Sequence, residues 1–138
     1  MSAEFPITIF HNPDCGTSRN ALAMIRAAGY APTVVEYLKT GWTRPQLESL
    51  LAAMGARPRE VLREKGTPAA ELGLLDPAVG DQAILEAMVR RPILVNRPIV
   101  VTPKGTRLCR PSEAVLALLD NQPAGFTKED GEVVIPPR

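Results

Sequence analysis

The start of the chain combines apolar residues at strand spacing with apolar residues at helix spacing. Residues 7–10 form a short apolar run rich in β-branched side chains, which predicts a strand. Apolar residues at helical spacing follow over 17–28, where Thr17 and Ser18 are possible N-caps. A second β-branched run over 33–38 predicts another strand. A strand, a helix and a strand of these lengths are typical of a βαβ unit with parallel strands.

Helical patterns dominate the middle of the chain. Thr43 and Gln46 have the spacing of a capping box in front of an apolar stripe, and Asp81 begins a second stripe of the same kind. Between them, residues 58–64 and 68–75 have the pattern of short helices. We therefore expect a helical segment after the βαβ unit.

The pattern changes again near the end. Residues 99–102 and 106–109 are strand-like and flank Pro103-Lys104-Gly105, which predicts an antiparallel hairpin. A helix should follow, with the core-facing residues Val115, Leu116, Leu118 and Leu119. Proline, glycine and charge then predict a weakly structured tail over 122–138. No repeat or linker divides the chain, so we expect a single α/β domain over 1–138.

Length and charge narrow the possible functions. The chain has 138 residues and a mass of 14.9 kDa, which suits one domain. Its 16 Lys and Arg balance 15 Asp and Glu, and a net charge of +1 gives no general attraction to nucleic acid or to a membrane. We see neither a secretory signal nor an apolar stretch that could span a bilayer, so we expect a cytoplasmic location, where thiols stay reduced. Two cysteines and one histidine are too few for a closed structural zinc site.

Cys15 lies where the first predicted strand leads into the first predicted helix. The N–H groups and the positive dipole end of a helix N-terminus stabilise a thiolate there. Free cysteines are often small buried apolar residues, which is the alternative. The polar neighbours Asp14 and Arg19 favour a reactive thiol instead. The Cys-x-x-Ser motif of 15–18 has no second cysteine, so an external thiol must resolve whatever Cys15 forms.

Two other positions near Cys15 bear on its chemistry. A phosphatase-type phosphate loop would have an arginine six positions after the cysteine, but Ala21 stands there, which excludes the low-molecular-weight phosphatase pattern. His11 could lower the pKa of the thiol as an imidazolium, or carry a proton. It could equally hold the loop by hydrogen bonding, and the sequence leaves both roles open.

The predicted hairpin brings two arginines together. Arg97 precedes its first strand and Arg110 follows its second, so the two residues should be near neighbours. Adjacent guanidinium groups repel one another unless an anion lies between them, which indicates an oxyanion site. Arg63 is a third candidate for this site, with Arg107 and Arg19 as lesser ones.

The hairpin contains two further residues of interest. Pro98 follows Arg97, and because only about 5–6% of X–Pro bonds are cis, the residues alone predict a trans bond. Cys109 ends the second strand and lacks the helix N-terminus that activates thiols, so we expect a buried structural thiol. A role in resolving a disulfide is the alternative.

Several motifs together closely resemble the glutaredoxin-coupled arsenate reductase family. They are HNPDCGTSRN at 11–20, NRPIVVT at 96–102 and GTRLCRPSE at 105–113, and the similarity continues to FTKEDGE at 126–132. The resemblance implies a thioredoxin-like α/β fold with a helical insertion, here residues 42–91, between a βαβ half and a ββα half.

The resemblance also implies roles for individual residues. In this family the cysteine matching Cys15 is the nucleophile, and the histidine matching His11 is linked to its low pKa. The arginines matching Arg63, Arg97 and Arg110 hold the oxygens of arsenate and arsenite. The local match that carries Arg63 is less distinctive than the other two.

The same resemblance implies a supporting set around the nucleophile, namely Gly16, Thr17, Ser18 and Pro98. It implies a cis bond before Pro98. It also implies that the first strand lies antiparallel to the strand after Pro98, which would bring Cys15 and Arg97 together. Near Arg63, Arg59 is the alternative arginine.

The chemistry that the resemblance implies is reduction of arsenate to arsenite. The thiolate attacks arsenic, glutathione acts as co-substrate, and glutaredoxin clears the resulting mixed disulfide, without a metal or a bound cofactor. One alternative is a glutathione-dependent thiol or disulfide reductase on the same fold. Another is an Spx-type regulator that binds RNA polymerase, although those proteins often have Cys-x-x-Cys where this chain has a serine at 18.

Overall fold

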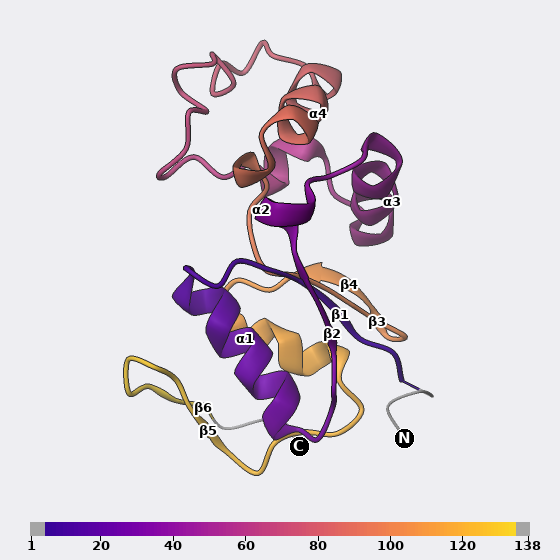
Figure 1. Cartoon of the computed structure of the whole chain (residues 1–138), viewed down its shortest axis with the longest axis vertical. Coiled ribbons are helices and arrows are strands. Elements are labelled where there is room, and N and C mark those ends of the chain that lie inside the picture. Colours follow the sequence, from indigo (N-terminus) through magenta and orange to yellow (C-terminus); the bar gives the residue numbers. More distant parts are fainter. Residues whose placement is uncertain (1–4, 135–138) are drawn as a thin grey trace. The chain divides into compact units, whose positions relative to one another are not determined.

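The structure of the chain is a computed structural model that describes residues 5–134 (Figure 1). The chain forms two compact units. The first contains the described residues up to Glu36 and those from Arg97 onward, and the second is Tyr37–Asn96. The second unit contains the whole of the predicted insertion 42–91 and extends beyond it at both ends. Over the part of the chain described, no helix has the length and apolar character to cross a membrane.

A four-stranded mixed sheet organises the first unit. The strands are β1 (Thr8–His11), β2 (Thr33–Glu36), β3 (Ile99–Thr102) and β4 (Gly105–Leu108), in the order β2-β1-β3-β4. β1 pairs with β2 in parallel and with β3 antiparallel, and β3 and β4 form an antiparallel hairpin. The predicted α/β class, the parallel strands of the βαβ unit and the hairpin are therefore confirmed.

Helix α1 (Gly16–Ala27) and the 3₁₀ helix η4 (Ser112–Leu118) share one hydrophobic core with this sheet. Ile25 of α1, Val100 of β3 and Val115 of η4 are among its fully buried side chains. These contacts pack α1 against the strands. The sheet and the helix together therefore set the position of the loop that joins β1 to α1.

The predicted final helix has the expected buried face but a different geometry. All four of its predicted core residues are buried, yet the segment is a 3₁₀ helix rather than an α-helix. Over only seven residues, an apolar pattern fits periods of 3.0 and 3.6 almost equally well, so the sequence could not separate the two.

The second unit consists of short helices. They are α2 (Tyr37–Thr40), α3 (Arg44–Met54), η2 (Pro58–Val61), α4 (Asp81–Arg90) and η3 (Pro92–Leu94). The predicted capping box is confirmed: Gln46 N–H donates to Thr43 Oγ1 at 3.2 Å, and the Thr43 N–H donates to the Gln46 side chain. Helix α3 ends at Gly55 with a left-handed φ of 64°.

Two of the predicted short helices differ from the structure. The helix expected over 58–64 is the shorter η2, and the helix expected over 68–75 is wrong, because that segment forms a series of turns. Gly73 has a φ of 74°, which a right-handed helix cannot contain, so the apolar spacing of the segment does not become a regular helix. Ala69 and Leu74 are buried nonetheless.

The tail contains more structure than its composition indicated. Strands β5 (Phe126–Thr127) and β6 (Val133–Val134) pair antiparallel within the predicted weakly structured segment 122–138. Val134 is buried in the core of the first unit. The last residues of that predicted segment, 135–138, lie outside the described part of the chain.

Candidate active site

The loop between β1 and α1 contains the candidate nucleophile. Its backbone turns tightly, because the Cys15 N–H donates to the carbonyl oxygen of Asn12 at 3.1 Å and the Asp14 N–H donates to Asn12 Oδ1 at 2.9 Å. The Asn12 N–H donates to Ser18 Oγ at 3.1 Å, which ties the loop to the first turn of α1. Cys15 itself is buried at the end of this loop.

The start of α1 differs from the sequence-based expectation in one respect. Neither Thr17 nor Ser18 is the N-cap; Cys15 is, in an extended conformation, and no side chain caps the helix. The thiol thus stands where a capping oxygen would stand. Backbone N–H groups of the first turn therefore act on a sulfur rather than on a hydroxyl oxygen, and they lower the pKa of the thiol.

Opposing effects act on the pKa of the Cys15 thiol. Burial by itself raises this pKa. The Ser18 N–H, the charge of Arg97 and the guanidinium of Arg110 lower it, in that order, and the Thr17 N–H adds a smaller effect. The lowering effects together are larger, so the pKa of Cys15 lies below its ordinary value and the thiolate is favoured.

The β3–β4 hairpin brings two arginines to this thiol. Arg110 Nη1 lies 3.9 Å from Cys15 Sγ and donates to the carbonyl oxygen of Arg97 at 2.9 Å. The predicted approach of residues 97 and 110 is confirmed. The bond before Pro98 is cis, as the resemblance implied and the residues alone did not. The bond before Pro111 is also cis, which the sequence did not predict.

His11 is the last residue of β1 and is buried beside the loop. Its Nδ1 lies 2.8 Å from Ser18 Oγ, the same oxygen that accepts from the Asn12 N–H. Burial lowers the pKa of His11, although Glu36 opposes this effect. A neutral imidazole follows near neutral pH, because an ordinary histidine pKa is about 6.5. This geometry favours the loop-holding role over the imidazolium role.

Cys109 has the environment expected of a structural thiol. It is fully buried just after β4, and its Sγ lies 3.7 Å from the carbonyl oxygen of Arg107. Burial raises the pKa of Cys109 to about 12, against a small opposing effect of the Arg107 charge. The thiol is protonated at any physiological pH.

Arg63 belongs to the second unit, together with the other arginines of its neighbourhood. Arg59 donates to the carbonyl oxygens of Leu74, Asp76 and Val79 at 2.8–3.1 Å. Arg57 forms an ion pair with Asp81 at 3.1 Å. These two guanidinium groups therefore hold the second unit's own loops and helix.

Gly16, the first residue of the predicted supporting set, has no steric requirement for glycine. A Cβ at this position would lie 3.7 Å from the Arg19 guanidinium and 3.8 Å from the Glu129 carboxylate, both ordinary van der Waals distances. The same measurement reveals a neighbour that the sequence did not suggest. Glu129, from the tail, lies against the first turn of α1.

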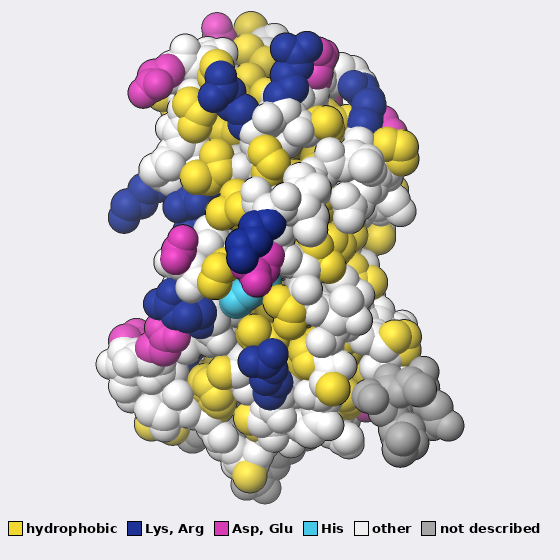
Figure 2. Space-filling model, in the orientation of Figure 1, with side chains coloured by type: hydrophobic (Ala, Val, Ile, Leu, Met, Phe, Trp, Pro, Cys, Tyr) yellow, Lys and Arg dark blue, Asp and Glu magenta, His cyan; other side chains and the backbone are white. Residues whose placement is uncertain are grey.

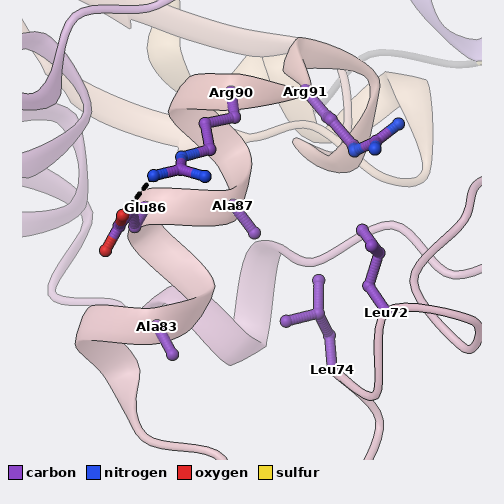
Figure 3. Close-up of a pocket in the computed structure, with 7 residues that line it drawn as sticks. All are labelled: Leu72, Leu74, Ala83, Glu86, Ala87, Arg90 and Arg91. Atoms are coloured by element: carbon purple, nitrogen blue, oxygen red, sulfur yellow. Dashed lines mark hydrogen bonds and ion pairs between the residues drawn. The ribbon is translucent and has the colours of Figure 1, made fainter.

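Two other features of the described residues are their surface charge and a pocket in the second unit. On the face shown in Figure 2, basic and acidic side chains of the described residues are interspersed, in line with the net charge of +1. A pocket of about 460 Å³ lies within the second unit (Figure 3). It is lined by Leu72, Leu74, Ala83, Glu86, Ala87, Arg90 and Arg91. None of these is a predicted site residue, and Arg90 is ion-paired with Glu86 at 2.9 Å.

No cluster of three or more His, Cys, Asp or Glu side chains that could hold a metal ion occurs within residues 5–134. The candidate site contains the Cys15 thiol and the nearby guanidinium groups of Arg97 and Arg110. Such a site can bind a tetrahedral oxyanion and attack it with sulfur.

Comparisons with known proteins agree on a family. A sequence model of the ArsC family matches residues 10–118. The chain is 64% identical to "Arsenate reductase ArsI2" of Synechocystis sp. over 96% of this chain and 95% of that protein. It is 55% identical to "Arsenate reductase" of Escherichia coli strain K12 over 94% and 92%. Among solved structures, "Arsenate reductase from Vibrio cholerae" superposes with a TM-score of 0.79 at 38% identity, covering 83% of this chain and 98% of that chain.

Proposed function

The chain belongs to the ArsC family and is an enzyme that reduces arsenate, and from this premise we propose that Cys15 is its nucleophile and that glutathione and glutaredoxin supply the electrons. The observation that carries the proposal is the thiol at the N-terminus of α1, with Arg110 Nη1 3.9 Å from its sulfur. The strand order and the antiparallel pairing of β1 with β3 support a thioredoxin-like fold around it.

Arg97 and Arg110 bind the arsenate oxygens in this proposal, and Arg63 keeps the substrate role that the family resemblance implies. A thiolate and an oxyanion repel one another, since two unit charges 4 Å apart interact with about 4 kcal/mol at an effective dielectric constant of 20. Guanidinium groups beside the sulfur offset this repulsion and stabilise the charge that develops on oxygen.

The reaction then proceeds by thiol substitution at arsenic. The Cys15 sulfur forms a bond to arsenic, and one arsenate oxygen leaves as water after taking up protons. The glutathione sulfur then attacks the Cys15 sulfur, the sulfur–arsenic bond breaks, and its electron pair stays on arsenic, which falls to the trivalent state. These electrons come from two thiol groups, which end as a mixed disulfide that glutaredoxin clears, and arsenite leaves. The sum is arsenate plus two thiols giving arsenite, a disulfide and water.

His11 acts in this scheme as a positioning residue. Its contact with Ser18 Oγ at 2.8 Å supports the hydroxyl that accepts the Asn12 N–H, so it steadies the loop that ends at Cys15. Its lowered pKa gives no imidazolium to stabilise the thiolate. Thr17 and Ser18 contribute their backbone N–H groups to the sulfur.

The alternative function is a glutathione-dependent thiol or disulfide reductase that uses the same cysteine. The arginine pair directly beside the thiol favours an oxyanion substrate, because the sulfur–sulfur bond of a disulfide carries no charge for these guanidinium groups to bind at that point. An Spx-type regulator has no evident use for them either.

The test is an arsenate reduction assay with glutathione, run with and without glutaredoxin. We expect arsenite production that requires both, and no production by Cys15→Ser. Turnover of a glutathione mixed disulfide without arsenate reduction would favour the alternative. Activity that persists without glutaredoxin would retain the nucleophile but contradict the proposed reductant.

A further inference from the structure

Arg19 joins three parts of the first unit. Its Nη1 donates to the carbonyl oxygen of Pro13, in the loop before Cys15, at 2.7 Å. Its Nε and Nη2 donate to the two carboxylate oxygens of Glu129 at 2.8 and 2.9 Å. Since Arg19 lies in the first turns of α1, one guanidinium connects the nucleophile loop, the helix and the tail hairpin.

Glu129 is held firmly enough to orient that guanidinium. Its own N–H donates to Asn20 Oδ1 at 3.1 Å, so the residue contacts α1 at a second point. The preceding residue, Lys128, has a nearly buried side chain, and its Nζ pairs with Glu113 at 2.7 Å and with Glu132 at 3.1 Å. The carboxylate is therefore presented by an anchored turn rather than by a free surface loop.

We propose that Glu129, acting through Arg19, is a positioning residue that holds the Cys15 loop against the start of α1. The proposal rests on the proposed role of Cys15 as nucleophile and extends it to the tail. It also assigns Arg19, a lesser candidate for the oxyanion, to a structural contact, because a carboxylate already occupies its Nε and Nη2 groups.

An exposed ion pair usually contributes little to stability. The side chains of Arg19 and Glu129 are 43% and 49% exposed, so the pair should matter little for folding. Its effect should instead be on the geometry of the N–H groups that face the sulfur. Small displacements of reacting groups cost up to about 10²-fold in rate, and this is the effect that the variants below should reveal.

The sign of the change in the Cys15 pKa separates positioning from simple electrostatics. The charged groups that act on this thiol are Arg97 and Arg110, with Arg19 nearby. Removing the negative charge of Glu129 would, by charge alone, stabilise the thiolate and lower its pKa. Loosening the loop would weaken the N–H contacts and raise it.

The experiment measures the pH dependence of Cys15 alkylation by iodoacetamide in the full chain, with the modified peptide identified by mass spectrometry. In Glu129→Ala we expect the pKa of Cys15 to rise by about half to one unit, and alkylation at pH 7 to slow about two- to fivefold. Glu129→Gln, which keeps one oxygen acceptor, should fall between Ala and the parent. Arg19→Lys keeps the charge but cannot bridge Pro13 and Glu129, so it should resemble Glu129→Ala.

The matched control is Asp120→Asn, which neutralises the carboxylate of another exposed pair, with Lys104 at 4.0 Å. It should leave the thiol pKa unchanged. With arsenate, kcat of Glu129→Ala should fall about tenfold while KM changes less than about twofold, since Glu129 acts through Arg19 rather than on the substrate.

An unchanged or lowered thiol pKa in Glu129→Ala would overturn the positioning role, and so would a lowered melting temperature without any change in that pKa. The alkylation readout does not depend on arsenate. If the parent chain failed to reduce arsenate while the variants still moved the thiol pKa, the proposed function would fall and the positioning role would stand.

Discussion

The surroundings of Cys15 and of Cys109 show how one residue type acquires two chemistries within the same unit. Both thiols are buried. Cys15 lies at the N-terminus of α1 beside Arg110, while Cys109 lies after β4, where its sulfur contacts the carbonyl oxygen of Arg107. Burial raises the pKa of both, but only at Cys15 do N–H donors and guanidinium groups outweigh it.

Burial alone is therefore no guide to thiol reactivity. The direction of the nearest backbone dipoles decides it, because N–H groups stabilise a thiolate and a carbonyl oxygen does not. The contrast between the two cysteines can be tested at each of the groups that create it.

The largest effect is expected from Cys15→Ser. A serine hydroxyl has too high a pKa to become an anion under the same donors, so arsenate reduction should fall by about 10³-fold or more. An arsenite-specific assay with glutathione and glutaredoxin measures this loss. Cys109→Ser in parallel should keep most of the turnover; a comparable loss in both variants would end the distinction between the thiols.

Arg110→Gln should have the next largest effect. It removes a charge and the donor 3.9 Å from the sulfur, so the pKa of Cys15 should rise and kcat/KM for arsenate should fall about 10²-fold. Lys104→Gln, in the turn of the same hairpin, is the control and should change neither quantity. Equal effects of the two substitutions would mean that general surface charge, rather than this guanidinium, acts on the site.

Ser18→Ala should lower kcat about tenfold, because it removes the oxygen that joins His11 to the Asn12 N–H. Unfolding should become easier by about 1–3 kcal/mol, because the Asn12 N–H is left buried without that acceptor. Steady-state kinetics and urea unfolding measure the two. The backbone N–H of residue 18 is unchanged in this variant. Full activity would therefore show that this N–H acts on Cys15 without help from the Ser18 hydroxyl.

Cys109→Ser should have the smallest effect on activity, but it should change how stability depends on pH. The pKa of Cys109 is raised by folding to about 12, so the folded state keeps a proton that the unfolded chain loses above about 8.5. The contribution of this thiol to the free energy of unfolding is thus fully present below that pH. Above it, the contribution declines by about 1.4 kcal/mol per pH unit. Cys109→Ser should remove this alkaline decline, as urea unfolding between pH 8 and 11 would show. An equal decline in the variant would contradict the raised pKa.

Local signals in the sequence account for what could be predicted. Thr43 and Gln46 specify a capping box by their spacing alone, and the turn Pro103-Lys104-Gly105 specifies a hairpin whose ends must meet. The approach of Arg97 to Arg110 follows from that hairpin. Each of these inferences needs only residues that are close in sequence.

Features that depend on packing could not be predicted in this way. The ion pair of Arg19 with Glu129 joins residues 110 positions apart, and no local pattern marks the second of them. The lowered pKa of His11 follows from its burial, which the sequence left open. The turns around Gly73 follow from a backbone conformation that apolar spacing does not reveal.

The most direct test of the central claim is the pH dependence of alkylation of the two cysteines in the parent chain, followed separately by mass spectrometry of their peptides. Cys15 should react with an apparent pKa below about 8.5, the ordinary value for a thiol, while Cys109 stays unmodified in the folded chain up to pH 10. Apparent pKa values for Cys15 at or above the ordinary value would contradict an activated thiolate at the start of α1.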